Sequence, residues 1–339
     1  MSNTNDYIIT TLSSGSSEYT DLCGRATEAP FSLASPSART LRLTGAPYVA
    51  TRSNPSSIFT RQVLTPGAGG GVPSTITQAA NLQHWWKLNE GASTTADSGQ
   101  SGASSTQMTF TSATSATGGP TAINSPSYVV FDGTSGFGQV TVVDTSNNDS
   151  NINTIFAAGN FSVCFWLKNL NAGAEAQGDA IFNATSFGGS TTSNNGVGTW
   201  YRTFSSDWYA FIGDGNNGQV GDFMTGSNIG WVTSAESRAA WVHCAMVVDN
   251  TAAELRTYVN GTLRGTRSIV GTVNAKVGPN TGNHGSYMIL GGSPNNSQNA
   301  ALSVGRFSNV GIVDFRIYDT VLSTDNLSSI NSGDWQDVC

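Results

Sequence analysis

From about Asn81 onward, hydrophobic and polar residues alternate in short segments that are separated by Gly, Ser, Asn and Asp. A period of two is typical of strands that bury one face, and frequent turns between such segments are typical of antiparallel sandwiches and barrels. The pattern therefore predicts an all-β fold. The clearest segments are Trp85–Leu88, Tyr128–Phe131, Gln139–Val143, Phe161–Leu167, Ala180–Phe182, Trp200–Phe204, Trp208–Ile212, Ala240–Val248, Leu255–Val259, Tyr287–Leu290 and Gly311–Tyr318.

One segment, 161–168, has two unlike faces. Its odd-numbered residues are Phe161, Val163, Phe165 and Leu167, and its even-numbered residues are Ser162, Cys164, Trp166 and Lys168. Successive side chains of a strand point to opposite sides of the sheet. We expect the odd-numbered residues to lie in a core between two sheets, and the even-numbered ones to lie on a curved, partly open sheet.

Two local signals fix a turn and a helix. The dipeptide Asn260-Gly261 between two alternating segments predicts a hairpin, because both turn positions need a positive φ. One credible helix follows Ser323, which can cap it, and Gly333 can end it. We expect this helix to have one or two turns.

Residues 1–78 differ from the rest of the chain. They contain no Trp, they hold six of the ten prolines, and they end near the Gly-rich run at 67–71. This composition predicts an extended N-terminal docking arm with a flexible hinge, followed by a sandwich domain at 79–339. Short pieces such as Tyr7–Ile9 and Arg39–Leu43 could pair with the sheet edge of a neighbouring molecule, since alone they have too little core to fold.

Charged residues make up only 11% of the 339 residues, and the formal net charge is -7. Ordinary soluble proteins have about a quarter charged residues. The arm carries five arginines and four acidic residues, so the sandwich holds a charge of -8. With three lysines in the chain, nucleic-acid binding is disfavoured, because it needs a dense row of cations. The surface is expected to be hydrated by hydroxyls and amides.

Hydrophobic residues reach 38% of the chain, which is enough for a sizeable core. No apolar run approaches the roughly 20 residues that span a bilayer, so membrane insertion is not expected. The first residues lack the features of a secretory signal. The four cysteines, Cys23, Cys164, Cys244 and Cys339, lack metal-ligand spacing, and we expect free buried thiols.

Several segments in a fixed order resemble laminin-G-like, concanavalin-A-like lectin/glucanase domains. They are His84–Gly91 with Asp97-Ser98-Gly99, Val130–Gly136, Phe161–Lys168, Trp241–Asp249 with Tyr258–Gly261, and Val313–Tyr318 with Leu322-Ser323. The resemblance spans residues 81–333. It implies a jelly-roll sandwich of two antiparallel sheets, and it says nothing of residues 1–78.

Some relatives with this fold hydrolyse β-glucans with two glutamates on one strand, in a Glu-x-Asp-x-x-Glu pattern. A period of two places such carboxylates on the same face, about 5 Å apart. The six glutamates here are Glu18, Glu28, Glu90, Glu175, Glu236 and Glu254, and no two share a predicted strand. The three histidines are far apart, and no nucleophile elbow, phosphate loop or zinc spacing is present. We therefore expect no enzymatic activity.

Calcium is the one cofactor that the resemblance implies. Many such domains hold it through carboxylates and carbonyls, and the candidates here are Glu90, Asp97 and Asp314. Asp132 and Asp249 are instead expected to form turns, because each precedes a glycine or an asparagine.

Aromatic residues among asparagines suggest a glycan-binding face. The aromatic candidates are Trp200, Tyr201, Trp208, Tyr209 and Trp231, near Asn194, Asn195, Asn216 and Asn217. Aromatic rings stack on sugar C–H groups and amides bond hydroxyls. Alternation must send about half of these rings into the core, and the sequence does not say which.

These features favour a non-enzymatic virion structural protein of a bacteriophage, either a capsid decoration or a tail-fibre subunit. The arm would bind other virion proteins, and the lectin-like domain would be displayed outward, where it could bind a host-surface glycan. Such a particle is assembled in the host cytoplasm, and a homo-oligomer, a trimer by the habit of fibres, is expected. The alternative is a secreted or cell-surface carbohydrate-binding protein of a microbe. A glycoside hydrolase ranks last.

Overall fold

The computed structural model describes the backbone of six strands within residues 7–63 and most of residues 76–334. Backbone and side chains are described at 76–90, 93–102, 106–143, 149–173, 175–176, 179–184, 196–203, 205–213, 229–269, 273, 287–293 and 304–334, and the backbone alone at 185–186, 195, 227–228 and 294. The chain divides into two compact units, with the boundary between Gly70 and Gly71.

The first unit contains two three-stranded antiparallel sheets. Their strands are β1 (Tyr7–Ile9), β2 (Ser16–Asp21) and β3 (Ala26–Ser32) in one, and β4 (Thr40–Arg42), β5 (Tyr48–Thr51) and β6 (Thr60–Val63) in the other. The pieces expected to add to a neighbour's sheet pair within this chain instead, β1 with β2 and β4 with β5. The role of this unit in docking stays a prediction.

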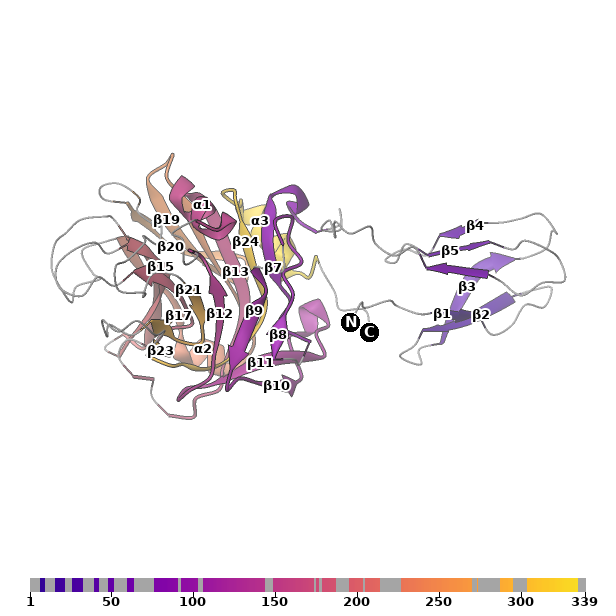
Figure 1. The fold of residues 1–339 in the computed structure, drawn as a ribbon, viewed down its shortest axis with the longest axis horizontal. Helices are drawn as coiled ribbons and strands as arrows, with labels where there is room; N and C mark the ends of the chain where they lie inside the picture. Colours follow the sequence, from indigo (N-terminus) through magenta and orange to yellow (C-terminus); the bar gives the residue numbers. More distant parts are fainter. Residues whose placement is uncertain are drawn as a thin grey trace. The chain divides into compact units, whose positions relative to one another are not determined.

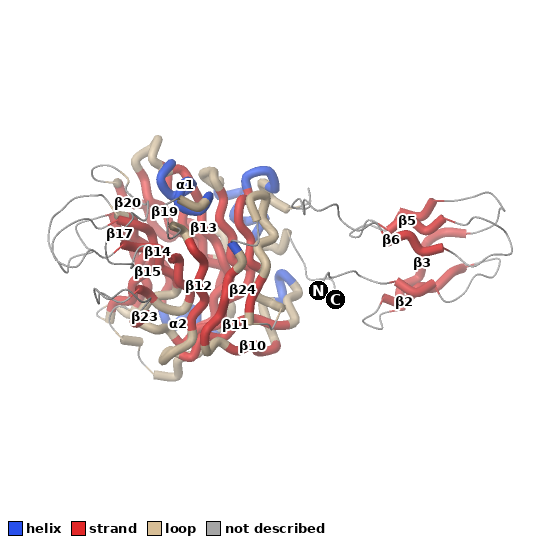
Figure 2. The backbone as a smooth tube through the Cα atoms, in the orientation of Figure 1, coloured by secondary structure: helices blue, strands red, loops and turns tan. Residues whose placement is uncertain are grey.

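The second unit is a sandwich of two antiparallel sheets, each with eight strands among the described residues (Figure 1). Sheet 1 has the order β10-β11-β24-β13-β18-β19-β20, and β7 also pairs with β24. Sheet 2 has the order β17-β16-β15-β14-β21-β12-β9-β8. Strands dominate this unit, and its helices are short (Figure 2). The all-β jelly-roll prediction is confirmed.

The strands have the following bounds. Sheet 1 consists of β7 (Leu82–Trp86), β10 (Thr114–Thr117), β11 (Ser127–Asp132), β13 (Asn160–Asn169), β18 (Val242–Asp249), β19 (Glu254–Val259), β20 (Thr262–Ser268) and β24 (Asn309–Tyr318). Sheet 2 consists of β8 (Thr94–Thr95), β9 (Met108–Thr111), β12 (Phe137–Thr141), β14 (Phe182–Ser186), β15 (Asn195–Arg202), β16 (Asp207–Ile212), β17 (Ser227–Thr233) and β21 (Tyr287–Leu290). The short strands β22 (Ser293–Pro294) and β23 (Val304–Gly305) pair separately.

The main core lies between the two sheets. The odd-numbered residues of β13 from Phe161 to Leu167 all lie in it, as alternation predicted, and Phe165 stacks on Phe315 of β24 with ring centroids 5.4 Å apart. Phe182 of sheet 2 meets the same two rings edge-on. This aromatic contact joins the two sheets across the middle of the sandwich.

The outer face of sheet 1 is covered, and the expectation of a partly open face on β13 is wrong. Cys164 and Trp166 belong to a second buried cluster with Leu327 and Ile330 of α3 (Thr324–Asn331). Alternation shows that a strand has two faces, but it cannot show that a helix from the end of the chain packs on the second one.

The helix after Ser323 is confirmed, and it begins with a capping box between Ser323 and Asn326. The expectation of a single helix is wrong. The structure adds α1 (Asn151–Ala158) and α2 (Ser234–Ala239), and α2 has its own capping box between Thr233 and Glu236. This Thr-x-x-Glu signal was present in the sequence. None of the helices among the described residues is long and apolar enough to cross a membrane.

Several local predictions hold. Asn260 and Gly261 have φ values of 50° and 74° and connect β19 to β20 as a hairpin. Asp132 forms a turn, because its carboxylate accepts backbone N–H bonds from Thr134, Ser135 and Gly136. Cys164 and Cys244 are buried free thiols, whereas Cys23 and Cys339 lie outside the described residues.

A buried ion-pair network joins the two ends of the sandwich. The guanidinium of Arg316 is fully enclosed and bonds Asp314 at 2.8 Å and Asp334 at 2.9 Å. Asp334 also accepts the backbone N–H of Thr77 at 2.7 Å. The Asp334 side chain, which lies in the last described segment, therefore connects both Thr77 in the first described segment and Arg316 of β24.

Candidate functional site

Three of the five aromatic candidates for glycan binding lie in the core. Tyr201, Trp208 and Trp231 are at most 3% exposed and belong to the cluster between the sheets. Trp231 reaches the core at a bulge in the pairing of β16 with β17, where its ring meets Phe165 at 5.6 Å. The assignment of these three residues to a glycan-binding face is therefore wrong, because a buried ring has no face for a sugar.

The other two candidates, Trp200 and Tyr209, lie together on the outer face of sheet 2. They are directly paired across β15 and β16, and both are partly exposed. Alternation explains the placement, since their neighbours Tyr201 and Trp208 point into the core. We call Trp200 and Tyr209 the aromatic pair.

An arginine lies over each ring of the aromatic pair. The guanidinium carbon of Arg306 is 4.8 Å from the ring centroid of Trp200, and that of Arg202 is 4.7 Å from the centroid of Tyr209. Both distances are within the range of cation–π attraction. Arg202 shares the outer face because it lies two residues after Trp200 on β15, whereas Arg306 comes from the segment that follows β23.

A glycine opposes the aromatic pair on its β17 side. Gly230 pairs with Tyr209, and a Cβ atom at this position would lie 3.7 Å from the tyrosine ring. The surface beside the ring is therefore formed by the backbone of Gly230 and by the Asp207 carboxylate, whose Oδ2 would lie 3.6 Å from the same Cβ.

Asp179 lies next to Arg306. Burial raises the pKa of the Asp179 carboxyl to about 6, and the negative charge of Glu175 adds to this rise. The backbone N–H of Ala176, which donates to the carboxylate at 2.8 Å, and the charge of Arg306 oppose it. Asp179 is only 9% exposed, so the guanidinium of Arg306 is the more accessible member of the pair.

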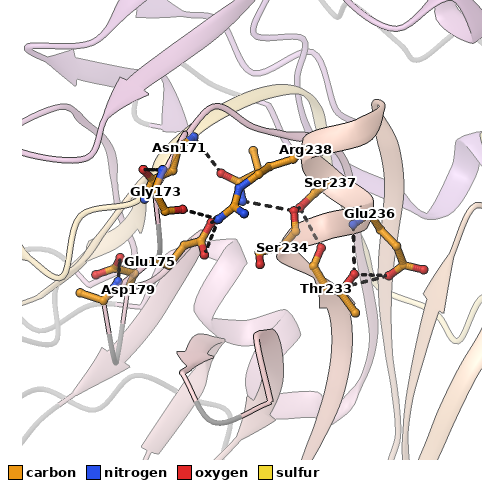
Figure 3. A network of polar contacts seen from close by, with 11 residues as sticks. Asn171, Gly173, Glu175, Asp179, Thr233, Ser234, Glu236, Ser237 and Arg238 are labelled. Atoms are coloured by element: carbon orange, nitrogen blue, oxygen red, sulfur yellow. Dashed lines mark hydrogen bonds and ion pairs between the residues drawn. The ribbon is translucent and has the colours of Figure 1, made fainter.

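The loop that carries Asp179 is held by a network around α2 (Figure 3). Arg238 donates to both carboxylate oxygens of Glu175, at 2.9 and 3.0 Å, and also to the carbonyl of Gly173. Asn169 at the end of β13 donates to the same glutamate. These bonds hold the backbone between the end of β13 and Asp179, the residue that lies next to Arg306.

The three calcium candidates do not come together as a ligand set. Asp97 binds the side chain of His84 at 2.6 Å and accepts the backbone N–H of Trp85 at 2.9 Å. Burial alone would raise the pKa of Asp97, but these partners hold it below 3.8. Asp314 bonds Arg316 and the Trp85 indole, and Glu90 is exposed.

No group of three His, Cys, Asp or Glu side chains suited to a metal ion occurs in the described part of the chain. The residues named for calcium therefore do not form a ligand set among the described residues, and Asp97 and one oxygen of Asp314 are bonded to protein donors instead. The presence of calcium in the protein stays an open prediction.

Arg202, Arg306 and Asp179 were not predicted from the sequence as residues of the site. Arg202 could have been found, because it shares the strand face of Trp200. Arg306 carried no local signal, since more than a hundred residues separate it from Trp200. Four asparagines were expected to bond sugar hydroxyls near these rings. Asn194, Asn216 and Asn217 lie outside the described residues, and only the backbone of Asn195 is described.

A family model described as the Concanavalin A-like lectin/glucanases superfamily matches residues 134–328. The resemblance stated from the sequence is confirmed over these residues. No curated protein matches the chain.

Solved structures show a distant likeness. The binding domain of Paraclostridial Mosquitocidal Protein 1 has 14% identity and a TM-score of 0.49 over 74% of this chain and 52% of that chain. The binding domain of botulinum neurotoxin DC, in complex with SialylT, has 13% identity and a TM-score of 0.49 over 74% of this chain and 51% of that chain. Trypanosoma rangeli sialidase has 15% identity and a TM-score of 0.47 over 75% of this chain and 33% of that chain. This chain thus spans about half the length of the first two and about a third of the sialidase, and likeness at this level says nothing of ligand or activity.

Proposed function

Because the chain belongs to the Concanavalin A-like lectin/glucanases superfamily, we propose that its sandwich binds carbohydrate without cleaving it. The fold alone does not decide this, since binding and catalytic proteins share it. The proposal depends on the site at the outer face of sheet 2.

One observation carries the proposal: Trp200 and Tyr209 lie side by side on this face, partly exposed and outside the core. Large aromatic side chains stabilise a fold when they are buried, and these two are held at the surface instead. The exposed parts of the rings offer flat apolar area to sugar C–H groups, and the guanidiniums of Arg202 and Arg306 lie within cation–π distance of them.

The burial and the ion pairing of the carboxylates argue against glycoside hydrolysis. Asp179 has the raised pKa that suits a general acid. Its acidic neighbour Glu175, however, is 4% exposed and is held on both oxygens by Arg238. Glu236 and Glu254 form ion pairs with Arg264 and Arg256. A retaining glycosidase needs an accessible carboxylate nucleophile beside the acid, and Glu175 is not placed to be one.

We propose further that the lectin-like unit is displayed by a bacteriophage virion, as a capsid decoration or a tail-fibre subunit. Residues 1–78 would dock on other virion proteins, in a homo-oligomer assembled in the host cytoplasm. The low charge and the Pro-rich composition of residues 1–78 support this. The alternative is a secreted or cell-surface microbial protein with the same binding site.

A glycan array tests the binding proposal. The full chain is compared with the double variant Trp200→Ala/Tyr209→Ala and with Trp241→Ala. Trp241 is a matched control, because it is a partly exposed tryptophan next to sheet 1, where it packs on Tyr128. Binding that is lost in the double variant and kept in the control supports the proposal. Binding that is equal in all three would assign the sugar to another surface.

The docking proposal has a separate test. The full chain and a fragment that begins at residue 79 are each incubated with virions that lack this protein. Binding by the full chain alone supports a docking arm. Equal binding by the fragment would refute it.

A further inference from the structure

We propose that His243 makes the outer face of sheet 1 sensitive to acid: when the buried imidazole takes up a proton, α3 and residues 332–334 leave the sheet while the two sheets stay packed. We call α3 with residues 332–334 the C-terminal cover. The inference is independent of the proposed carbohydrate binding. It comes from the burial of His243, from the charges around it, and from the turn that connects it to α3.

His243 lies on the outer face of β18, enclosed and unbonded. Its neighbours Val242 and Cys244 point into the core between the sheets, so His243 points the other way, where its ring centroid is 5.4 Å from that of Trp166. It is 1% exposed, and among the described residues neither ring nitrogen has a hydrogen-bond partner. A protonated ring would therefore bury a positive charge and two N–H donors without an acceptor.

The charges closest to His243 oppose a further positive charge. The enclosed guanidinium of Arg316 disfavours a proton on the imidazole, whereas the carboxylate of Asp334 favours one. Asp334 is already paired with Arg316, so its charge is balanced. Burial, which is the largest effect, and the charge of Arg316 lower the pKa of His243 from 6.5 to about 3.

The other ionisable groups described on this face supply no free counter-charge. Asp314 of β24 bonds Arg316 and the Trp85 indole. The one charged residue of α3 is Asp325, which is exposed. The remaining groups are the thiol of Cys164 and the phenols of Tyr258 and Tyr318, which are uncharged in acid, and the ammonium groups of Lys87 and Lys168.

The β19–β20 turn connects His243 to α3. The Asn260 side chain accepts the backbone N–H of His243 at 2.9 Å, and the Asn260 N–H donates to the His243 carbonyl at 2.8 Å. The next residue, Gly261, lies against α3, because a Cβ atom there would be 3.1 Å from the Cα of Ser328. A displacement of His243 is therefore transmitted to the C-terminal cover through this turn.

The C-terminal cover is held more weakly than the strands beneath it. Leu327 and Ile330 pack on the outer cluster, and Asp334 bonds Arg316 and the N–H of Thr77. Strand β18, in contrast, is paired on both sides, with β13 and β19. Segments with few contacts open at a lower free energy than the whole fold, so the cover should open before the sandwich unfolds.

The direction of the pH effect follows from the two protonation equilibria. The imidazole binds a proton weakly inside the closed cluster and regains its ordinary pKa of about 6.5 when the ring meets water. Acid therefore favours the open form, increasingly from about pH 6.5 down to about pH 3. These pKa values predict an open population that is about 100-fold larger at about pH 4.5 than at about pH 7.5.

Two buried free thiols report separately on the two sides of sheet 1. Cys164 belongs to the outer cluster, and Cys244 belongs to the core between the sheets. The full chain with Cys23→Ser and Cys339→Ser is treated with a dipyridyl disulfide, which labels exposed thiols in acid, and peptide mass spectrometry gives the rate for each thiol. Each rate is divided by that of the urea-unfolded chain at the same pH. Between about pH 7.5 and about pH 4.5, we expect the rate for Cys164 to rise about 100-fold and that for Cys244 to change less than about twofold.

Two variants replace the imidazole by apolar side chains that do not titrate, His243→Leu and His243→Phe. Either variant that protects both thiols at neutral pH should also protect Cys164 in acid. Asp334→Asn is the control, because it removes a carboxylate from the same network and keeps the imidazole. It should open more readily at every pH and still show the rise in acid.

The other outcomes would overturn the inference. A rise that persists in the His243 variants, or that is lost in Asp334→Asn, would assign the acid sensitivity to another group. Equal labelling of Cys164 and Cys244 would mean that the sandwich unfolds as a whole. Labelling of Cys164 that does not change with pH would mean that the C-terminal cover stays closed in acid.

Discussion

Trp200 and Tyr209 are a cross-strand pair on β15 and β16, and a guanidinium lies over each ring. Their neighbours in sequence, Tyr201 and Trp208, meet in the core with ring centroids 5.2 Å apart. The same two strands thus place one aromatic pair inside the sandwich and another outside. The inner pair belongs to the core between the sheets, and the outer pair is the candidate binding surface.

This division predicts losses of stability of different size for two tryptophans. Trp208→Ala should lower the free energy of unfolding by about 3–5 kcal/mol, the usual loss for a large aromatic removed from a core. Trp200→Ala should lower it by about 1 kcal/mol or less, because the ring is partly exposed. Urea unfolding of both variants measures this. Equal losses would mean that the outer pair is part of the structural core.

The pKa of Asp179 predicts a pH-dependent stability. Its folded value of about 6 lies above the ordinary 3.8, so the folded protein binds this proton more tightly than the unfolded chain does. The contribution of Asp179 to stability is therefore greatest below pH 4 and is lost as the pH rises to about 6.

Asp179→Asn removes this titration and keeps an oxygen that can accept the N–H of Ala176. The variant should be more stable than the wild type at pH 7 and equal to it at pH 3.5, as measured by chemical denaturation at both values. A difference in stability between the variant and the wild type that does not change with pH would contradict the raised pKa of Asp179.

The network around Arg316 predicts a loss of stability at the end of the chain. Asp334→Ala removes one carboxylate from the enclosed guanidinium and one acceptor from the N–H of Thr77. We expect unfolding to become easier by about 1–3 kcal/mol, as for other buried groups that lose a partner. The control Asp325→Asn lies in the first turn of α3, exposed, and should cost about 0.3–1 kcal/mol. Equal losses of stability in the two variants would show that the ion-pair network around Arg316 does not stabilise the fold.

Chelation tests the calcium prediction. The carboxylates of Asp97 and Asp314 are bonded to His84, Trp85 and Arg316, and the two do not belong to a group of ligands around one point. We expect the melting temperature to be the same in EDTA and in excess Ca²⁺. A melting temperature that rises with Ca²⁺ would show a site formed by other residues.

The sequence predicted the sheets better than the site. The alternation along β13 correctly predicted that Phe161, Val163, Phe165 and Leu167 lie in the core between the sheets, because this set of side chains is uniformly apolar. In β16 both sets are apolar or aromatic, Trp208, Ala210 and Ile212 against Tyr209 and Phe211. Period alone could not tell inside from outside there. Which set of β16 side chains points inward depends on which one packs against sheet 1 across the core.

The arginines of the site show a second limit. Arg306 reaches Trp200 because the segment after β23 lies against Ala180, where the two backbones bond. Such a contact depends on the pairing of distant segments and leaves no local pattern. The helices α1 and α2 were missed for a different reason, since Asn-rich and Ser-rich sequences have weak helix propensity and their caps are the clearer signal.

The most direct test of the account is calorimetric titration of the glycan with the strongest array signal into the full chain and its Trp200→Ala/Tyr209→Ala variant. The account predicts that the variant, folded as judged by its melting curve, binds at least tenfold more weakly, a loss of about 1.4 kcal/mol or more. The control Trp241→Ala should bind like the wild type. An unchanged dissociation constant in the double variant would contradict the central claim that the outer face of sheet 2 binds the sugar.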